Sequence, residues 1–370
     1  MNIRNVGVEE EFLLVDPATG EARAVAGAVL HAAAVQADGP GEQEPEYLEY
    51  ELQKQQVEIN TSPCGSLDDL AREVTRCRAL AARAASDAGA GLAALGTSPL
   101  PVEPELTAES RYRAMAREYE LTASEQLTCG CHVHVEVESA DEGVAVLDRI
   151  QPWLPVLLAM SANSPFWQGQ DSGYASYRYQ AWGRWPSAGP TGWFGSASDY
   201  AQTVEAMIGT GAVLDEGMVY FNARLSAHYP TLEVRVADVC LFPGDAVLLA
   251  ALIRALAQTE AQAWRDHPAG PPARLEVLKL AAWRASRSGL DGDLIAPRTG
   301  RPEPARQVIA ALAEHVRPAL ADAGDLDTVT GLLAELLARG NGAAFQRAAY
   351  RRSGRVADVV TSALEQTAPA

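Results

Sequence analysis

The chain has 370 residues, of which 48% are hydrophobic and 21% are charged. This composition is typical of a globular protein whose core is large enough to organise a buried site. Its 48 acidic residues outnumber its 30 basic residues and give a formal net charge of −18, which argues against a nucleic-acid backbone or an anionic membrane as the main partner.

The first eleven residues contain Arg4 and three glutamates and lack the apolar stretch of a secretory signal. Apolar runs such as residues 246–253 are much shorter than the ~20 residues of a membrane helix. We therefore expect a cytoplasmic protein. The five cysteines are an odd number at no regular spacing, which favours reduced thiols over a disulfide framework.

Hydrophobic periodicity and turn residues divide the chain into short strands and helices of very different lengths. The strands are predicted at residues 6–15, 51–59, 91–97, 128–138, 218–221 and 231–237, and the helices at 66–88, 111–121, 139–160, 198–208 and 245–265. The alanine-rich remainder is predicted to be helical to its end. This order, without a glycine-rich phosphate loop, favours an α+β fold with an antiparallel sheet over a doubly wound fold.

The first predicted strand carries three consecutive glutamates. Because side chains alternate along a strand, Glu9 and Glu11 share one face and Glu10 lies on the other. Two like charges then lie side by side where an apolar residue would normally pack. A hard divalent cation prefers oxygen ligands and neutralises their repulsion, so this pattern indicates a metal site.

A second motif is Thr-Cys-Gly-Cys-His-Val-His-Val-Glu at residues 128–136. Strand alternation places Cys129 and Cys131 on one face and His132 and His134 on the other. A zinc site that combines these thiols and imidazoles is therefore a minor option. We expect the histidine face to join the acidic strands around a hard metal. The alternative is that both histidines are hydrogen-bonded in a polar patch.

Further acids lie on two other strands. Glu51 and Glu58 are seven positions apart, so both can face one site only if Glu51 lies in a turn or the strand carries a bulge. Taken alone, they are more simply solvated surface charges. Glu233 and Arg235 share a face, and their apolar neighbours indicate that the opposite side of the strand is buried. An exposed ion pair is the alternative.

The stretch 163–195 is rich in glycine and aromatic residues and holds four of the seven tryptophans. Loops of this length are usually functional or mobile. Arg178 and Arg184 lie among its aromatic residues and could bind a triphosphate or a carboxylate; packing against tryptophan is the alternative. The chain has no Walker-type loop, no dinucleotide fingerprint and no Gly-x-Ser-x-Gly elbow.

Together these segments resemble the carboxylate-amine ligase family, also called glutamate-cysteine ligase type 2, of the glutamine synthetase superfamily. The resemblance keeps its order and spacing from residue 6 to about 244. It rests on residues 6–12, 130–135, 174–178, 184–191 and 230–236. The chain departs from many members at Asn222 and Leu225, where they carry Asp and Pro, and this leaves the acid and the amine open.

The resemblance implies one glutamine synthetase-like ligase domain over residues 1–370, with a sheet-containing catalytic part, 1–265, and a helical part, 266–370. An antiparallel β-sheet funnel flanked by helices would receive ATP from one side and the acid from the other. Relatives of this type are typically homodimers. The implied ligands of two or three Mg²⁺ or Mn²⁺ ions are Glu9, Glu11, Glu51, Glu58, His132 and Glu233; Arg235 and Arg178 would be catalytic, and Arg184, Arg224 and His134 would bind ATP.

The implied reaction begins with attack of a substrate carboxylate on the γ-phosphorus of ATP, with the charge neutralised by metals. An amine then attacks the acyl phosphate, and ADP, phosphate and an amide are released. Three alternatives stay open: a guanido kinase-like phosphotransferase, which releases no free phosphate, a catalytically silent nucleotide or metabolite sensor, and a metalloenzyme that binds no nucleotide.

Overall fold

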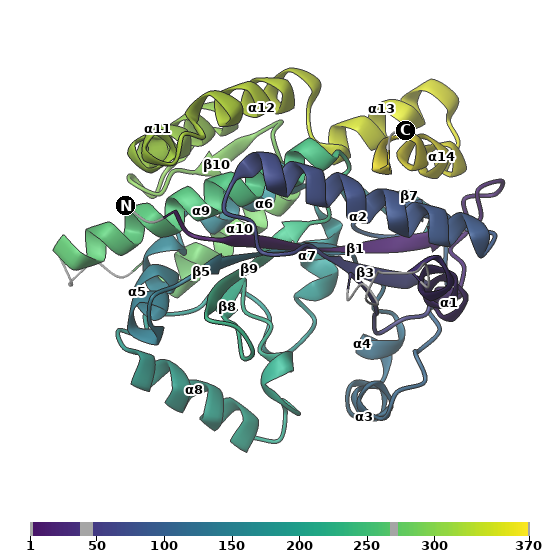
Figure 1. The fold of residues 1–370 in the computed structure, drawn as a ribbon, viewed down its shortest axis with the longest axis horizontal. Helices are drawn as coiled ribbons and strands as arrows, with labels where there is room; N and C mark the ends of the chain where they lie inside the picture. Colours follow the sequence, from purple (N-terminus) through teal and green to yellow (C-terminus); the bar gives the residue numbers. More distant parts are fainter. Residues whose placement is uncertain (1–2, 38–46, 267–272, 369–370) are drawn as a thin grey trace.

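The computed structural model describes residues 3–37, 47–266 and 273–368. At its centre lies a seven-stranded sheet in the order β2-β3-β1-β5-β9-β8, with β4 paired to β1 beside this path (Figure 1). Every pairing between the described strands is antiparallel, which confirms the predicted α+β fold class. The strands are β1 (Val6–Val15), β2 (Leu48–Tyr50), β3 (Gln56–Asn60), β4 (Gly91–Ala93), β5 (Gly130–Glu136), β8 (Ala223–Leu225) and β9 (Thr231–Asp238).

One face of this sheet is covered by helices that are far apart in the sequence (Figure 1). Apolar residues of β1, β5 and β9 pack there against α2, α6 and α9, so this face holds the main core. The C-terminal helices form a further layer on the same side. The helices of this side are α2 (Leu67–Asp87), α6 (Leu154–Ser161), α9 (Pro243–Asp266), α10 (Leu275–Ser288), α11 (Ala305–Ala323), α12 (Leu326–Arg339), α13 (Gly342–Ser353) and α14 (Val356–Thr367).

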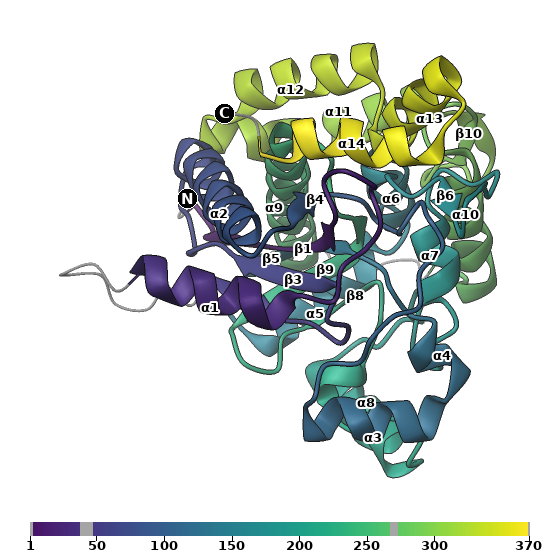
Figure 2. The ribbon, with the colours of Figure 1, turned by 90° about the vertical axis from the view of Figure 1, so that its right-hand side faces the viewer.

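The opposite face of the sheet, called the flanked face below, has helices beside it and no helical layer packed across it (Figures 1 and 2). Helices α3, α4 and α8 lie on this side, away from the C-terminal helices (Figures 1 and 2). The other elements lie on this side, at the edges of the sheet or in two small hairpins. They are α1 (Ala26–Ala37), α3 (Ser110–Tyr119), α4 (Leu121–Ser124), α5 (Ala140–Ile150), α7 (Tyr177–Trp182), α8 (Ala197–Gly209), the 3₁₀ turn η1 (Glu216–Met218), β6 (Phe166–Trp167), β7 (Gln170–Asp171), β10 (Asp293–Ile295) and β11 (Pro302–Pro304).

Two predicted elements differ from the structure. Of the strand expected at 51–59, only the second half is a strand, within β3, whereas residues 51–55, including Glu51, connect β2 to β3. The helix expected at 139–160 is α5 and α6, which meet at 70°. Pro152 and Pro155 lie at this bend, and proline disfavours a continuous helix because it has no N–H group to donate.

The strand predicted at residues 218–221 is wrong. This segment contains the end of η1, and Phe221 forms only an isolated bridge with Gly189. Within this segment the carbonyl oxygen of Met218 accepts a hydrogen bond from the Ser187 hydroxyl, that of Val219 accepts from the Arg224 guanidinium, and the Tyr220 amide donates to the Ser187 oxygen. Side chains therefore satisfy this backbone in place of a neighbouring strand.

A buried ion pair explains why β1 carries a charge on its core-facing side. The Glu10 carboxylate accepts hydrogen bonds from the Arg78 guanidinium of α2 at 2.6 and 2.8 Å, and both side chains are almost fully buried. Arg78 also donates to the carbonyl oxygens of Cys240, Leu241 and Thr367. The C-terminal end of α14 is thereby tied to the sheet.

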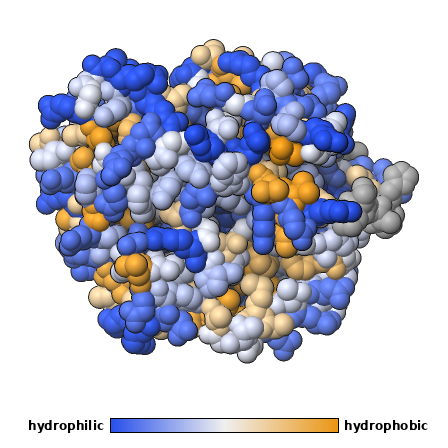
Figure 3. Space-filling view, turned by 180° about the vertical axis from the view of Figure 1, so that it is seen from behind, coloured by the Kyte–Doolittle hydropathy of each residue, from blue (hydrophilic) through white to orange (hydrophobic). Residues whose placement is uncertain are grey.

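The surface seen from behind carries hydrophobic patches between polar residues (Figure 3). Helix α10 exposes Val277, Leu280 and Trp283. Within the described residues, no single helix has the length and apolar composition needed to cross a membrane; the bent pair α5 and α6 meets that criterion only when the two are taken together. The division of the chain at residue 265 stays a prediction.

Candidate active site

The acids and histidines singled out from the sequence converge on the flanked face of the sheet. Strand register brings them together in cross-strand pairs. Glu9 of β1 lies opposite His132 of β5, and His134 lies opposite Glu233 of β9. On the other side of β1, Glu11 lies opposite Glu58 of β3.

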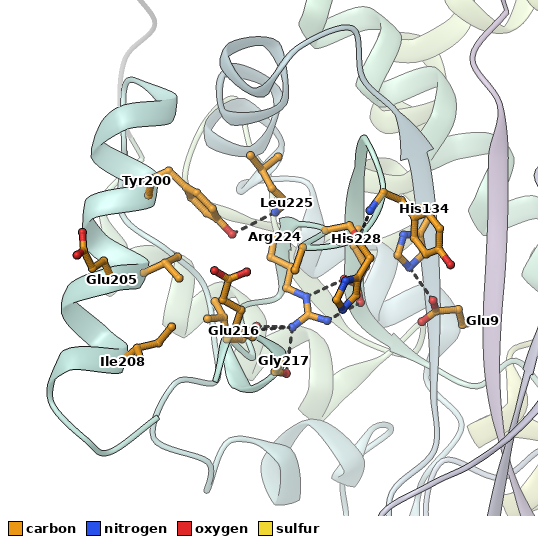
Figure 4. Close-up of a pocket in the computed structure, with 17 residues that line it drawn as sticks. Glu9, His134, Tyr200, Glu205, Ile208, Glu216, Gly217, Arg224, Leu225 and His228 are labelled. Carbon is orange, nitrogen blue, oxygen red and sulfur yellow. Dashed lines mark hydrogen bonds and ion pairs between the residues drawn. The ribbon is translucent and has the colours of Figure 1, made fainter. Parts of the chain in front are cut away.

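One group of possible ligands contains Glu9, His134 and Glu233. One ligand atom from each residue lies within 4.8 Å of the other two. The His134 ring places Nε2 2.9 Å from a Glu9 oxygen (Figure 4). The Nδ1 atom of the same ring lies 3.0 Å from the hydroxyl of Thr231. The structure thus places His134, which we expected to bind ATP, among potential metal ligands.

Two further groups continue this arrangement along the sheet. Glu9, Glu58 and His132 form one, and Glu11, Glu51 and Glu58 form the other, under the same 4.8 Å limit. Glu9 and Glu58 are shared, so the three groups are continuous. Because Glu51 lies in the connection after β2, it can face the same side as Glu58 despite their odd spacing.

The electrostatics of these groups fit a cation. Burial and the charge of Glu11 raise the pKa of Glu51 to about 7. Burial, followed by the charges of Glu9 and Glu51, raises the pKa of Glu58 well above its usual range. His132 Nε2 is buried without a hydrogen-bond partner among the described residues. Crowded carboxylates and an unpartnered imidazole nitrogen are what a divalent ion would stabilise.

The cysteines do not join these groups. None of the groups of potential ligands found among the described residues contains a thiol. Cys131 packs in the core, and the Cys129 sulfur accepts a hydrogen bond from Gln56 at 3.4 Å. Burial raises the pKa of the Cys129 thiol well above its usual range, which disfavours the thiolate that zinc requires.

Two arginines hold Glu233 in its ionised form. The Arg235 guanidinium pairs with one Glu233 oxygen, and Arg224 Nε donates to the other at 2.7 Å. Burial raises the pKa of Glu233, but the charges of Arg235 and Arg224 outweigh it and hold this pKa at about 2. Arg235 also approaches His132 Nδ1 at 3.4 Å, and it therefore lies at the centre of the cluster.

The two arginines of the aromatic stretch have different surroundings. The Arg178 side chain is buried, lies 5.7 Å from the ring centre of Trp182, and packs so closely on Gly130 that a Cβ there would collide with its guanidinium. Arg184 instead forms an ion pair with Glu125 at 2.6 Å. It lines neither of the two cavities described next, so the structure does not bring it to the acidic cluster.

Two cavities meet at the cluster. The larger, of about 540 Å³, is walled by α8 and by residues 225–229, with Tyr200 and Ile208 on its α8 side (Figure 4). The smaller, of about 220 Å³, contains Glu11, Glu51, Glu58, His132 and Arg235. Both are lined by Glu9, Gly217 and Arg224. The cluster is therefore accessible from two sides.

Several lining residues were not anticipated from the sequence. Arg111 of α3 forms a bidentate ion pair with Asp215, at 2.8 and 2.9 Å, at the wall of the smaller cavity. Tyr112, Gln126 and Tyr220 also line this cavity. Tyr220 lies in the segment wrongly predicted as a strand, and the other three lie on predicted helix or loop sequence without a site motif, so only the tertiary fold brings them to the sheet. Of the two departures noted above, Leu225 lines the larger cavity, whereas Asn222 is buried and donates to the Tyr179 hydroxyl.

A family model described as glutamate-cysteine ligase family 2 (GCS2) matches residues 5–362. The chain belongs to this family. A Streptomyces avermitilis protein named "Putative glutamate--cysteine ligase 2-1" is 54% identical over 99% of each chain, and a Streptomyces coelicolor relative is 52% identical over the same shares. The resemblance inferred from the strand motifs is confirmed, and with it the expected enzyme class, an ATP-dependent carboxylate-amine ligase.

Solved structures of low sequence identity share the fold. A bifunctional glutathione synthetase from Pasteurella multocida superposes with a TM-score of 0.70 at 16% identity; the match covers 99% of this chain and 52% of the synthetase. A glutamate-cysteine ligase from Francisella tularensis, in complex with AMP, has a TM-score of 0.67 at 14% identity over 100% of this chain and 90% of the ligase. These likenesses confirm the fold.

Proposed function

We propose that the protein is an ATP- and Mg²⁺-dependent ligase that couples a glutamate-like carboxylate to a cysteine-like amine through an acyl phosphate, releasing ADP and phosphate. The observation that carries this proposal is the continuous cluster of carboxylates and imidazoles beside Arg235, open to two separate cavities. Two substrates can then approach the same metals from different sides.

The metals would be held by the three groups that share Glu9 and Glu58. Bound there, Mg²⁺ or Mn²⁺ would neutralise the phosphate oxygens as the phosphoryl group is transferred. The protein contributes the fixed geometry, because each ligand sits on a paired strand or directly beside one. The paired arginines keep Glu233 ionised, so this ligand needs no proton loss before it can bind a cation.

The larger cavity suits ATP. Tyr200, Val204 and Ile208 give its α8 wall an apolar character that fits a base, while Arg224 and His134 lie at the end nearest the cluster, where phosphates would lie. The smaller cavity suits an acid of amino-acid size, because Arg235 lines it beside the ligand groups. A guanidinium there can stabilise the charge that develops on the transferring phosphoryl group.

The attacking group is best supplied by the substrate. Neither cavity is lined by a cysteine among the described residues. The Ser226 hydroxyl of the larger cavity accepts hydrogen bonds from the amides of His228 and Tyr229, a turn-forming role. Without an activated enzyme nucleophile, the substrate carboxylate is the group that attacks ATP.

The test is a product assay of the purified protein with Mg²⁺, ATP and arrays of amino acids and amines. We expect ADP and phosphate with an acid and an amine together. With the acid alone, hydroxylamine should trap a hydroxamate. AMP and pyrophosphate would refute the acyl phosphate, and phosphoryl transfer to a guanidino group without free phosphate would indicate a kinase.

The proposed assembly is a homodimer, in keeping with the expectation from the sequence. Helix α10 exposes Val277, Leu280 and Trp283, an apolar stripe of the kind that supports association. Light scattering of the purified protein measures the mass directly, and a value near 39.4 kDa would refute the dimer.

A further inference from the structure

Asp238 is a buried acid at the end of β9, three residues after Arg235. Its side chain is fully buried and lines neither cavity. One carboxylate oxygen accepts hydrogen bonds from the Asn163 amide at 2.8 Å and the Ser164 hydroxyl at 2.6 Å, and the other accepts from the Ser176 hydroxyl at 2.7 Å. These donors come from the stretch 163–195.

The two serine hydroxyls that bind Asp238 also bind the first turn of helix α7. Ser176 is the N-cap of α7, and its oxygen accepts a hydrogen bond from the Tyr179 amide at 3.3 Å. The Ser164 oxygen accepts from the Arg178 amide at 2.9 Å. Each hydroxyl therefore donates to Asp238 and accepts from the first turn of α7, so the carboxylate sets the position of the Arg178 backbone.

The Arg178 side chain extends from α7 toward His132 of the acidic cluster. Its guanidinium packs against Gly130, at a point where a Cβ would lie 3.0 Å from His132 Nε2. The Gly130 amide donates to the Glu11 carboxylate at 2.5 Å. Arg178 Nε is buried and has no hydrogen-bond partner among the described residues. The Arg178 side chain lines neither cavity, so it bears on the site through its contact with Gly130 and its place beside His132, which lines the smaller cavity.

We propose that Asp238 is a positioning residue of the ligase reaction. It holds α7 through Ser164 and Ser176, and its negative charge favours a placement of the Arg178 guanidinium beside His132. The inference rests on the proposed function, in which Glu11 and His132, the neighbours of Gly130 and Arg178, hold a metal ion. Asp238 itself does not touch the substrate and acts through Arg178.

The experiment is a double-mutant cycle of kcat/KM, measured as ADP release, with Asp238→Asn, Arg178→Lys and the double variant. Asparagine keeps the shape of the side chain but removes the charge and one acceptor. We expect each single variant to lose about 10–100-fold, the usual effect of removing a supporting group. The double variant should be no more than about threefold worse than Arg178→Lys alone, because both changes disable one element.

Asp148→Asn is the matched control. Asp148 is likewise a buried aspartate, and it accepts hydrogen bonds from the amides of Phe194 and Gly195 at the far end of the same stretch. In a double variant, the fold-losses of kcat/KM caused by Asp148→Asn and by Arg178→Lys should multiply, because the two sites are independent. Multiplicative effects of Asp238→Asn and Arg178→Lys would overturn the proposal and reduce Asp238 to a structural role.

A second measurement does not depend on activity. The ¹⁵N NMR signal of the Arg178 Nε–H group, assigned by its loss in Arg178→Lys, should shift in Asp238→Asn and stay in place in Asp148→Asn. An unchanged signal in Asp238→Asn would overturn the proposal. If the wild-type protein releases no ADP with any acid and amine, the proposed function fails, and the NMR measurement still decides whether Asp238 positions Arg178.

Discussion

Replacing Glu10 with glutamine tests whether the buried pair behind the site is essential to the fold. Glu10 and Arg78 are 1% and 0% exposed at their side chains, so the substitution leaves a buried guanidinium without its counter-charge. Removing one partner of such a pair typically costs about 3–5 kcal/mol. Arg78 keeps its hydrogen bonds to the carbonyl oxygens of Cys240, Leu241 and Thr367, which favours the lower end of that range.

The control lies on the same helix. Glu73 and Arg76 form an ion pair at 2.9 Å whose side chains are 23% and 47% exposed, and exposed pairs contribute less than about 1 kcal/mol. Urea unfolding followed by circular dichroism should therefore show a loss of at least about 2 kcal/mol more for Glu10→Gln than for Glu73→Gln. Equal losses in the two variants would refute the reasoning from burial.

Four further outcomes follow from the site. Glu233→Gln should abolish ADP release and weaken Mn²⁺ binding measured by electron paramagnetic resonance, with an unchanged circular dichroism spectrum. Arg235→Lys should lose most hydroxamate formation, since an ammonium cannot replace a guanidinium fork. Because the pKa of Glu51 is raised to about 7, the metal-free protein should lose stability to urea as pH rises from about 4.5 to about 7. Hydrogen exchange of residues 163–195 should slow in MgATP.

A specific result would refute each of these four predictions. Normal ADP release in Glu233→Gln would remove this residue from the ligand set. Arg317→Lys, a surface change in the Arg317–Glu314 pair, should leave hydroxamate formation unaltered; a loss equal to that of Arg235→Lys would indicate a nonspecific effect. A stability that rises between pH 4.5 and 7 would contradict the sign derived for Glu51, and equal exchange with and without MgATP would leave residues 163–195 as packing.

Regular strands could be predicted from the sequence because their pattern depends on near neighbours alone. The strand at residues 6–15 has the expected limits, and alternation placed Glu9 and Glu11 together and Glu10 apart, as found. The motif at residues 230–236 likewise identified β9 and its family. In these segments each side chain's direction is set by the two-residue repeat of the strand.

The tertiary structure decided what lies between the strands. Glu51 reaches the cluster because residues 51–55 form a connection where a strand was expected. The resemblance implied that Arg184 and Arg224 both bind ATP, yet Arg184 pairs with Glu125 away from the cavities and Arg224 pairs with Glu233 at their junction. Arg111 was expected only as the start of a helix at 111–121, without a signal for a site. Long side chains on turns and short helices point where packing directs them, and packing depends on residues that are distant in the sequence.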